Sequence, residues 1–81
     1  LYLEDWEAAQ EFCIRLAKHE HFNVRGNALL GFAHIARIHG KLDETLVKPL
    51  IANGLKDPHE YVRGHAIDAV DDIEHYLKWK F

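Results

Sequence analysis

A short segment of this chain occurs twice, and this repetition restricts the fold more than any other feature. Residues 61–66 read Tyr-Val-Arg-Gly-His-Ala, and residues 23–28 read Asn-Val-Arg-Gly-Asn-Ala, 38 positions earlier. The same offset gives further identities: Asp5 with Asp43, Lys18 with Lys56, His21 with His59 and Ile35 with Ile73. It also aligns apolar residues with one another, such as Cys13 with Ile51 and Leu29 with Ile67. A run of matches at one offset, with a period of roughly 20 to 50 residues, is typical of repeat architectures. We therefore expect two copies of one structural unit.

Four stretches show the periodicity of amphipathic helices, at residues 4–18, 21–39, roughly 44–55 and 58 to about 78. No stretch shows the strict alternation of a half-buried strand. Asp5 and Asp43 suit helix N-caps, and Gly40 suits the position just after a helix. The predicted inward faces are Trp6, Ala9, Cys13, Leu16 and Ala17; Val24, Ala28, Gly31, Phe32 and Ile35, with Leu29 and Ile38 beside them; Leu46, Val47, Leu50, Ile51 and Leu55; and Val62, Ala66, Ala69, Val70, Ile73 and Leu77.

Two prolines give local predictions. The segment Asp57-Pro58-His59-Glu60 resembles a capping box, with Asp57 as N-cap, Pro58 at the first helical position and Glu60 at the third. Pro49 lies inside the third predicted helix, where its missing N–H is expected to cause a kink.

The helices are expected to form two antiparallel hairpins, with repeat one at about 4–40 and repeat two at about 43–78. Two hairpins related by a fixed period stack into an α-solenoid. We therefore predict an all-α superhelical fold of about four helices in a single domain, residues 1–81. The chain begins with Leu1 and contains no methionine, so we also expect it to be part of a longer product.

The residues resemble the HEAT-repeat family. The resemblance rests on Pro49, the Asp57-Pro58 turn, Val62-Arg63 and Ala66. The first repeat keeps Val24-Arg25 and Ala28 but has Glu11 in place of Pro49 and His19 in place of Asp57. A second likeness, carried by residues 34–43 and 71–74, is to small bacterial HEAT-like proteins of unknown or toxin-neutralising role. The family resemblance implies that the second helix of each repeat lines a concave surface.

The residues give little support for catalysis or for a metal or cofactor site. The chain contains no serine, which excludes a serine triad among these residues. Cys13 lies on an apolar face and is predicted to be a buried structural thiol. HEAT-like deoxyhypusine hydroxylases carry iron-binding His-Glu pairs directly after Val-Arg, where this chain has Gly26-Asn27 and Gly64-His65. We predict a protein that is not an enzyme and that has no catalytic residues, metal ligands or cofactor.

Seven histidines are many for this length, and some stand near acids at helical spacing. His65, Asp68 and Asp72 are 3 and 4 apart, and Asp71 and His75 are 4 apart. Such sets could hold a metal. Our interpretation is instead a solvated helix face with local ion pairs, because no established metal-binding pattern accompanies them.

The repeated Arg-Gly pairs have a structural interpretation. Arg25 and Arg63 are expected to bridge neighbouring repeats or the preceding turn, with Asp57 as a partner for Arg63. A role in binding a partner molecule is the alternative. Gly26 and Gly64 are expected to allow close helix packing.

The outer lines of the second helix in each repeat are the candidate binding surface. Both lines follow a 3-4-3-4 spacing and therefore run along one side of a helix. They consist of Asn27, Leu30, His34, Arg37 and Lys41 in the first repeat and His65, Asp68, Asp72, His75 and Trp79 in the second. The first line is basic and the second acidic, which suits a protein partner better than a phosphate backbone. Leu30 and Trp79 are the expected hot spots.

We therefore predict a protein-interaction module, a HEAT-like adaptor or an immunity-type protein that binds a protein such as a toxin. The alternative is a nucleic-acid-binding protein, similar to HEAT-like DNA glycosylases with basic concave faces. Asp68, Asp72 and the net charge of −3 argue against it. A HEAT-like metal enzyme is the third reading. No run of about 18 apolar residues predicts a membrane span. A single cysteine fits a reducing compartment, so a cytoplasmic location is expected.

Overall fold

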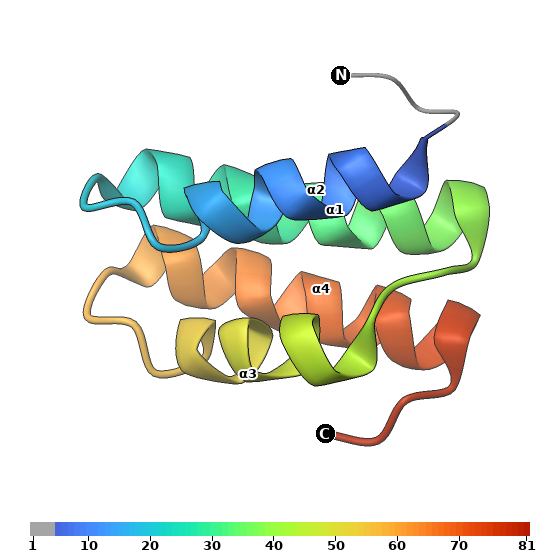
Figure 1. The fold of residues 1–81 in the computed structure, drawn as a ribbon. Coiled ribbons are helices and arrows are strands. Elements are labelled where there is room, and N and C mark those ends of the chain that lie inside the picture. The colour runs from blue at the N-terminus through green and yellow to red at the C-terminus, as the bar shows by residue number, and fades with distance from the viewer. Residues whose placement is uncertain (1–4) are drawn as a thin grey trace.

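The structure, a computed structural model, describes residues 5–81 and contains four helices connected by short turns (Figure 1). They are α1 (Trp6–Leu16), α2 (Phe22–His39), α3 (Glu44–Gly54) and α4 (Glu60–Leu77). No strand occurs within these described residues. The all-α prediction is confirmed, and the helix order agrees with two consecutive hairpins. The predicted helix start at residue 4 lies outside the described residues.

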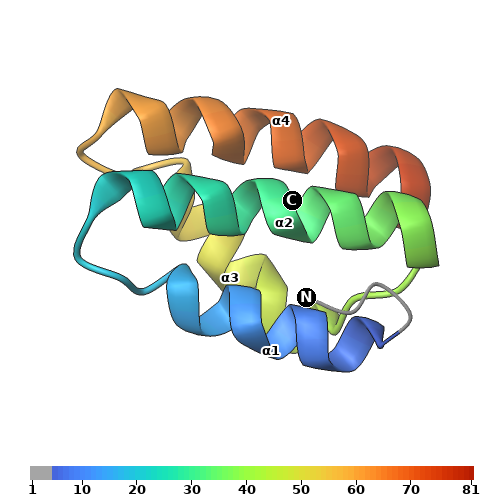
Figure 2. The same cartoon turned by 90° about the horizontal axis from the view of Figure 1, so that it is seen from above.

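The two long helices form one layer and the two short helices the other. Figure 2 shows α2 and α4 side by side and running in the same direction, with α1 and α3 beneath them. The contact between α2 and α4 is the most extensive in the molecule. Each short helix runs antiparallel to the long helix that follows it (Figure 1). One face of the α2–α4 layer is therefore free of the short helices.

The helices end where a residue forms hydrogen bonds with backbone groups that have no partner within the helix. Asp5 accepts a hydrogen bond from the N–H of Ala8, and Asp43 from that of Leu46. At the other end of α2, Gly40 adopts a left-handed conformation with φ 64°, and its N–H bonds to the carbonyl of Ala36. These three predicted caps are confirmed. After α4, Lys78 takes the same conformation with φ 62°, where a residue with a Cβ is uncommon.

The predicted start of α4 is wrong. The helix begins at Glu60, and its N-cap is His59, whose Nδ1 accepts a hydrogen bond from the N–H of Tyr61 at 3.1 Å. Asp57 does not cap the helix, because its carboxylate accepts the N–H of His59 and a bidentate bond from Arg25. His21 caps α2 in the same way through the N–H of Asn23.

The core lies between the two layers and uses residues of all four helices. Its buried members are Ala9, Cys13, Leu29, Phe32, Ala33, Ile35, Ala36, Val47, Ile51, Val62, Ala66, Ala69 and Ile73. Three residues predicted to pack inward or beside the inward face are instead exposed, namely Leu46, Leu55 and Ile38. Leu46 and Leu55 lie at the two ends of a short helix with neighbours on few sides. α3 continues through Pro49 to Gly54, and the kink there stays a prediction.

Polar contacts join the hairpins at both ends. The N–H of Asp43 donates to Oε1 of buried Gln10 at 2.6 Å, which fixes the start of α3 against α1. At the other end, Arg25 of α2 holds Asp57 in the turn before α4. None of the described helices is long and apolar enough to cross a membrane.

Candidate functional site

The candidate surface lies on the free face of the α2–α4 layer. Asn27, Leu30, His34 and Arg37 are exposed along α2, and Asp68 and His75 are exposed along α4. Because α2 and α4 are neighbours running in the same direction, the two lines lie beside each other. The surface is thus contiguous, with α2 contributing Arg37 and α4 contributing carboxylates.

The lines are shorter at their C-terminal ends than the spacing predicts. Lys41 follows the left-handed residue Gly40, and Trp79 follows the left-handed residue Lys78, so neither continues its helix. Trp79 is half-buried, packs against the core and lies 6.1 Å from Phe81 between ring centroids. Its indole therefore closes the end of the core, and Leu30 remains the one apolar member of the lines with an exposed side chain.

The histidines of the surface have different surroundings. His34 Nδ1 lies 2.8 Å from Nη2 of Arg37, one turn further along α2. His65 is half-buried where α4 meets α2, and its Nδ1 is buried with no hydrogen-bond partner among the described residues. In the described part of the chain, no group of three or more His, Cys, Asp or Glu side chains is arranged to hold a metal ion.

An aromatic cluster joins the starts of α2 and α4, and sequence reasoning missed it. The rings of Phe22 and His59 stack at 3.6 Å between centroids and 3° between planes. Tyr61 meets Phe22 and His65 edge-on, and its hydroxyl donates to Oδ1 of Asn27 at 2.7 Å. Phe22 and Tyr61 have no aromatic counterpart at the 38-residue offset, so comparing the repeats could not reveal the cluster. Tyr61 covers part of α2 at this end of the candidate surface.

Arg25 bridges the two repeats, as one interpretation of the repeated arginines predicts. Its Nε and Nη2 donate to the two carboxylate oxygens of Asp57 at 2.8 and 3.0 Å, and its Nη1 donates to the carbonyls of His19 and Glu20. The predicted pairing of Arg63 with the Asp57 carboxylate is wrong, because Arg25 occupies it. Arg63 Nη1 instead donates to the backbone carbonyl of Asp57 at 2.7 Å.

The pairing with Arg25 is the largest of the effects that lower the pKa of Asp57, and the N–H of His59 adds to it. An unfolded chain restores the usual aspartate pKa of about 3.9, so it binds more protons than the folded chain below that pH. The stability contributed by Asp57 is therefore present above about pH 4 and lost as the pH falls through the lowered folded pKa.

Asp57→Asn is accordingly expected to lower the free energy of unfolding at pH 7 and to approach the wild-type value as the pH falls below 4. Urea unfolding from pH 7 to pH 3 measures the difference between the two chains. Asp68→Asn is the matched control, because Asp68 is exposed and forms no ion pair in the described structure. A difference that stays constant with pH would show that the carboxylate charge of Asp57 does not stabilise the fold.

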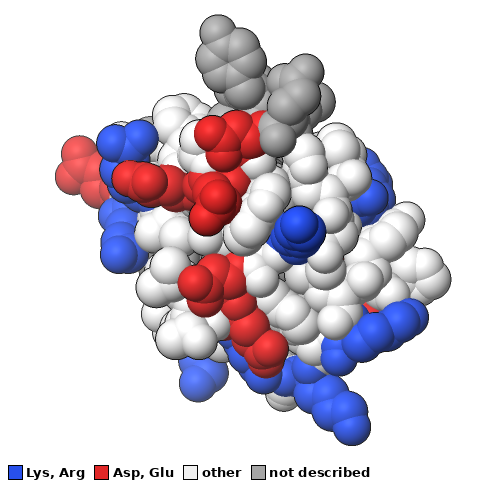
Figure 3. Space-filling model, turned by 45° about the vertical axis from the view of Figure 1, so that its right-hand side comes forward, with Lys and Arg blue, Asp and Glu red and all other residues white. Residues whose placement is uncertain are grey.

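The charge distribution is mixed. On the face shown in Figure 3, acidic side chains gather in two groups, and most basic side chains lie toward the edges of the view. The ten Lys and Arg and thirteen Asp and Glu residues leave a net charge of −3. Binding to a nucleic-acid backbone draws its affinity from clustered Lys and Arg, which this composition does not favour.

Gly26 and Gly64 occupy equivalent positions with different surroundings. A Cβ at Gly26 would lie 2.5 Å from Cε2 of Tyr61 and 3.3 Å from Cδ2 of His65, so this glycine lets the two helices approach closely. At Gly64 a Cβ would meet no atom within 4 Å. The close-packing prediction is thus correct for Gly26, whereas Gly64 has no such neighbour.

Comparison of the chain with protein-family models, with curated proteins and with solved structures gives no match in any of the three. The resemblance to HEAT repeats therefore stays a prediction from the residues, while the all-α fold with its four helices is shown by the structure.

Proposed function

We propose that this chain is a protein-interaction module, a HEAT-like adaptor or immunity-type protein, that binds a protein partner on the free face of the α2–α4 layer. The observation that carries the proposal is the exposure of Leu30 within the α2 line, which contains Arg37 and lies beside the acidic line of α4. An apolar anchor within a polar rim is the usual anatomy of a protein–protein interface.

The chemistry of the face supports a protein rather than a phosphate backbone. Arg37 on α2 and Asp68 on α4 offer charges of both signs to complementary side chains. Rim charges of this kind mainly set the association rate and its salt dependence. A partner with exposed charges of both signs and an apolar residue over Leu30 fits this arrangement. In the immunity-type version the partner is a toxin, and the encounter takes place in the cytoplasm.

Site-specific photo-cross-linking tests the location of the interface. A photoreactive residue at His34 is expected to cross-link one protein in the cells that produce the chain. The same residue at Glu11, exposed on α1 in the other layer, is the control and is expected to give no such product. Equal cross-linking from both positions would contradict the assignment of the face.

With the captured protein purified, Leu30→Ala is expected to weaken binding by about 1 kcal/mol or more, as for a typical hot spot. Isothermal titration calorimetry gives the affinity, and a thermal melt shows whether the fold is intact. Asp68→Lys combined with Asp72→Lys is expected to slow association. A fluorescent DNA duplex is the second probe. If the chain binds the duplex and this charge reversal tightens the binding, the ligand of the face is a nucleic acid and not a protein.

A further inference from the structure

The outward edge of α4 is a second exposed surface, which adjoins the face described above at His65 and Asp68. We define the α4 edge by Arg63, Gly64, Ile67, Asp71 and Glu74. The 38-residue offset aligns these positions with Arg25, Gly26, Leu29, Ala33 and Ala36 of α2. In α2 these positions receive the second hairpin, so the internal repeat shows what packs against such an edge.

The two edges differ in burial at every aligned apolar position. Leu29 is 2% exposed and lies against Gly54 of α3, whereas Ile67 is 55% exposed. Ala33 and Ala36 are 2% and 0% exposed, and their counterparts Asp71 and Glu74 are exposed acids. The first half of the α4 edge thus keeps the character of a packing surface, and the second half is acidic.

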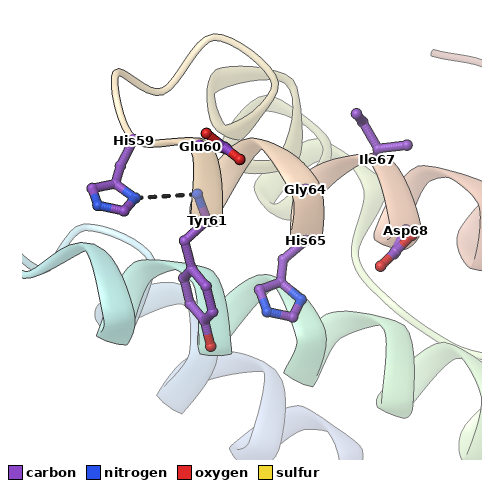
Figure 4. Close-up of a pocket in the computed structure, with 7 residues that line it drawn as sticks. All are labelled: His59, Glu60, Tyr61, Gly64, His65, Ile67 and Asp68. Atoms are coloured by element: carbon purple, nitrogen blue, oxygen red, sulfur yellow. Dashed lines mark hydrogen bonds between the residues drawn. The ribbon is translucent and has the colours of Figure 1, made fainter.

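Gly64 indicates independently that the α4 edge is a packing surface. Glycine is among the least favourable residues inside a helix. At Gly26 its presence is explained by the Tyr61 ring, but a Cβ at Gly64 would meet no atom within 4 Å. An open hollow of about 690 Å³ lies at this position, lined by His59, Glu60, Tyr61, Gly64, His65, Ile67 and Asp68 (Figure 4). The hollow has space for an aromatic ring placed as Tyr61 is placed over Gly26.

The arginines show the same difference. Arg25 and Arg63 both donate to a carbonyl six residues earlier, so their side chains are placed alike. Arg25 also pairs with a carboxylate from the following hairpin, whereas Arg63 has no carboxylate within 4.0 Å among residues 5–81. The α4 edge therefore presents a guanidinium that lacks the acid its counterpart holds.

We infer that the α4 edge docks a helical hairpin of a protein partner that supplies an aromatic ring over Gly64, a carboxylate to Arg63 and basic side chains to Asp71 and Glu74. Asp57 precedes Tyr61 by four residues and lies in the connection before α4, so the acid of the partner lies just before the helix that carries its aromatic residue. Asp71 and Glu74 follow Gly64 by about two and three turns. In a parallel arrangement the basic residues lie at those distances beyond the ring.

A second copy of this chain cannot offer that chemistry, because its own Asp57 and Tyr61 are already engaged by Arg25 and Gly26 of its α2. Only its first hairpin has a free leading edge. At the position of Tyr61 its first hairpin has Asn23, and at the position of Asp57 it has His19. Neither an aromatic ring nor a carboxylate would reach the α4 edge from it. The partner is therefore a different hairpin.

The test appends a copy of residues 44–81 directly after Phe81, with Phe81→Asp to provide the N-cap that Asp43 provides. The added hairpin brings counterparts of Asp57, Tyr61 and His65 to the α4 edge. The three-hairpin chain is expected to melt in one transition, at a higher temperature than the original chain. Amide hydrogen exchange at Ile67 is expected to slow at least tenfold.

Gly64→Leu, made in both chains, distinguishes docking from a general gain in helix stability. In the original chain it is expected to leave the melting temperature unchanged or raise it, because the position is open. In the three-hairpin chain it is expected to lower the melting temperature by about 5 °C or more, because the side chain takes the place of the ring. An equal rise in both chains, or a separate transition for the added hairpin, would overturn the proposal.

A separate pair of variants tests whether Asp71 and Glu74 bind basic side chains. Asp72 and Tyr76 follow His65 by 7 and 11 residues on one side of α4, so their counterparts in the added hairpin lie toward Asp71 and Glu74. Asp72→Lys and Tyr76→Lys, made only in the added copy, are expected to raise the melting temperature at low salt and not at 1 M salt. If the melting temperature does not rise at low salt, the partner does not supply basic side chains to Asp71 and Glu74. The original chain is also examined by sedimentation. A dimer that Gly64→Leu abolishes would show that a second copy of this chain, rather than a different protein, docks on the α4 edge.

Discussion

Val62→Asp is expected to unfold the chain. Val62 is 1% exposed and belongs to the buried core. A carboxylate there would lack a partner, and an unpaired buried charge costs several kcal/mol even after the protein relaxes. A domain of this size has a free energy of unfolding of roughly 5 to 10 kcal/mol, so most or all of the stability would be lost. Circular dichroism at 222 nm and a thermal melt measure the effect.

Val24→Asp is the matched control, because Val24 is the counterpart of Val62 in the first repeat. Val24 is half-buried, so its carboxylate can reach water, and a smaller loss of stability is expected. A Val62→Asp variant that melts cooperatively with native helicity would show that α4 does not turn this face to the core.

Cys13 is expected to react with thiol reagents at least 100-fold more slowly in the folded chain than in the unfolded chain. The side chain is 4% exposed, and burial raises the pKa of its thiol from 9.0 to about 11. Because the thiolate is the reactive form, a rise of two pKa units lowers the reactive fraction about 100-fold at neutral pH. Limited access lowers the rate further.

The chain has one cysteine, so Ellman's reagent reports on this site alone. The rate is measured at pH 7.4 with and without 6 M guanidinium chloride. Gly31→Ala provides a second chain, because a Cβ at Gly31 would lie 2.6 Å from Sγ of Cys13 and should loosen the packing there. Its thiol is expected to react faster than the wild-type thiol. Similar rates for folded and unfolded wild-type chain would contradict the buried position of the thiol.

Most of the helices could be predicted because their signals are local. Helical periodicity and the caps Asp5, Gly40 and Asp43 depend on neighbours within one or two turns, and the structure contains them. The start of α4 could not be predicted in the same way. The segment at Asp57 satisfies the local rule for a capping box, but Arg25, 32 residues away, engages the carboxylate.

The candidate surface was predictable only in part. The helical parts of the two lines follow from spacing, so Leu30, Arg37 and Asp68 lie where the period places them. Trp79 differs because the chain turns at Lys78 through a left-handed conformation, which sequence patterns rarely assign to a lysine. The exposure of Leu46 and Leu55 also escaped prediction, since periodicity shows which residues share a face but not how far neighbouring helices cover it.

The extensive contact between α2 and α4 has a consequence for how the molecule opens. Each long helix packs more against the other than against the short helix of its own hairpin. The cooperative unit is therefore the pair of long helices rather than either repeat, and the fold is not expected to lose one hairpin while keeping the other. Partial opening instead releases the short helices, so amide protons of α1 and α3 should exchange with solvent before those in the middle of α2 and α4.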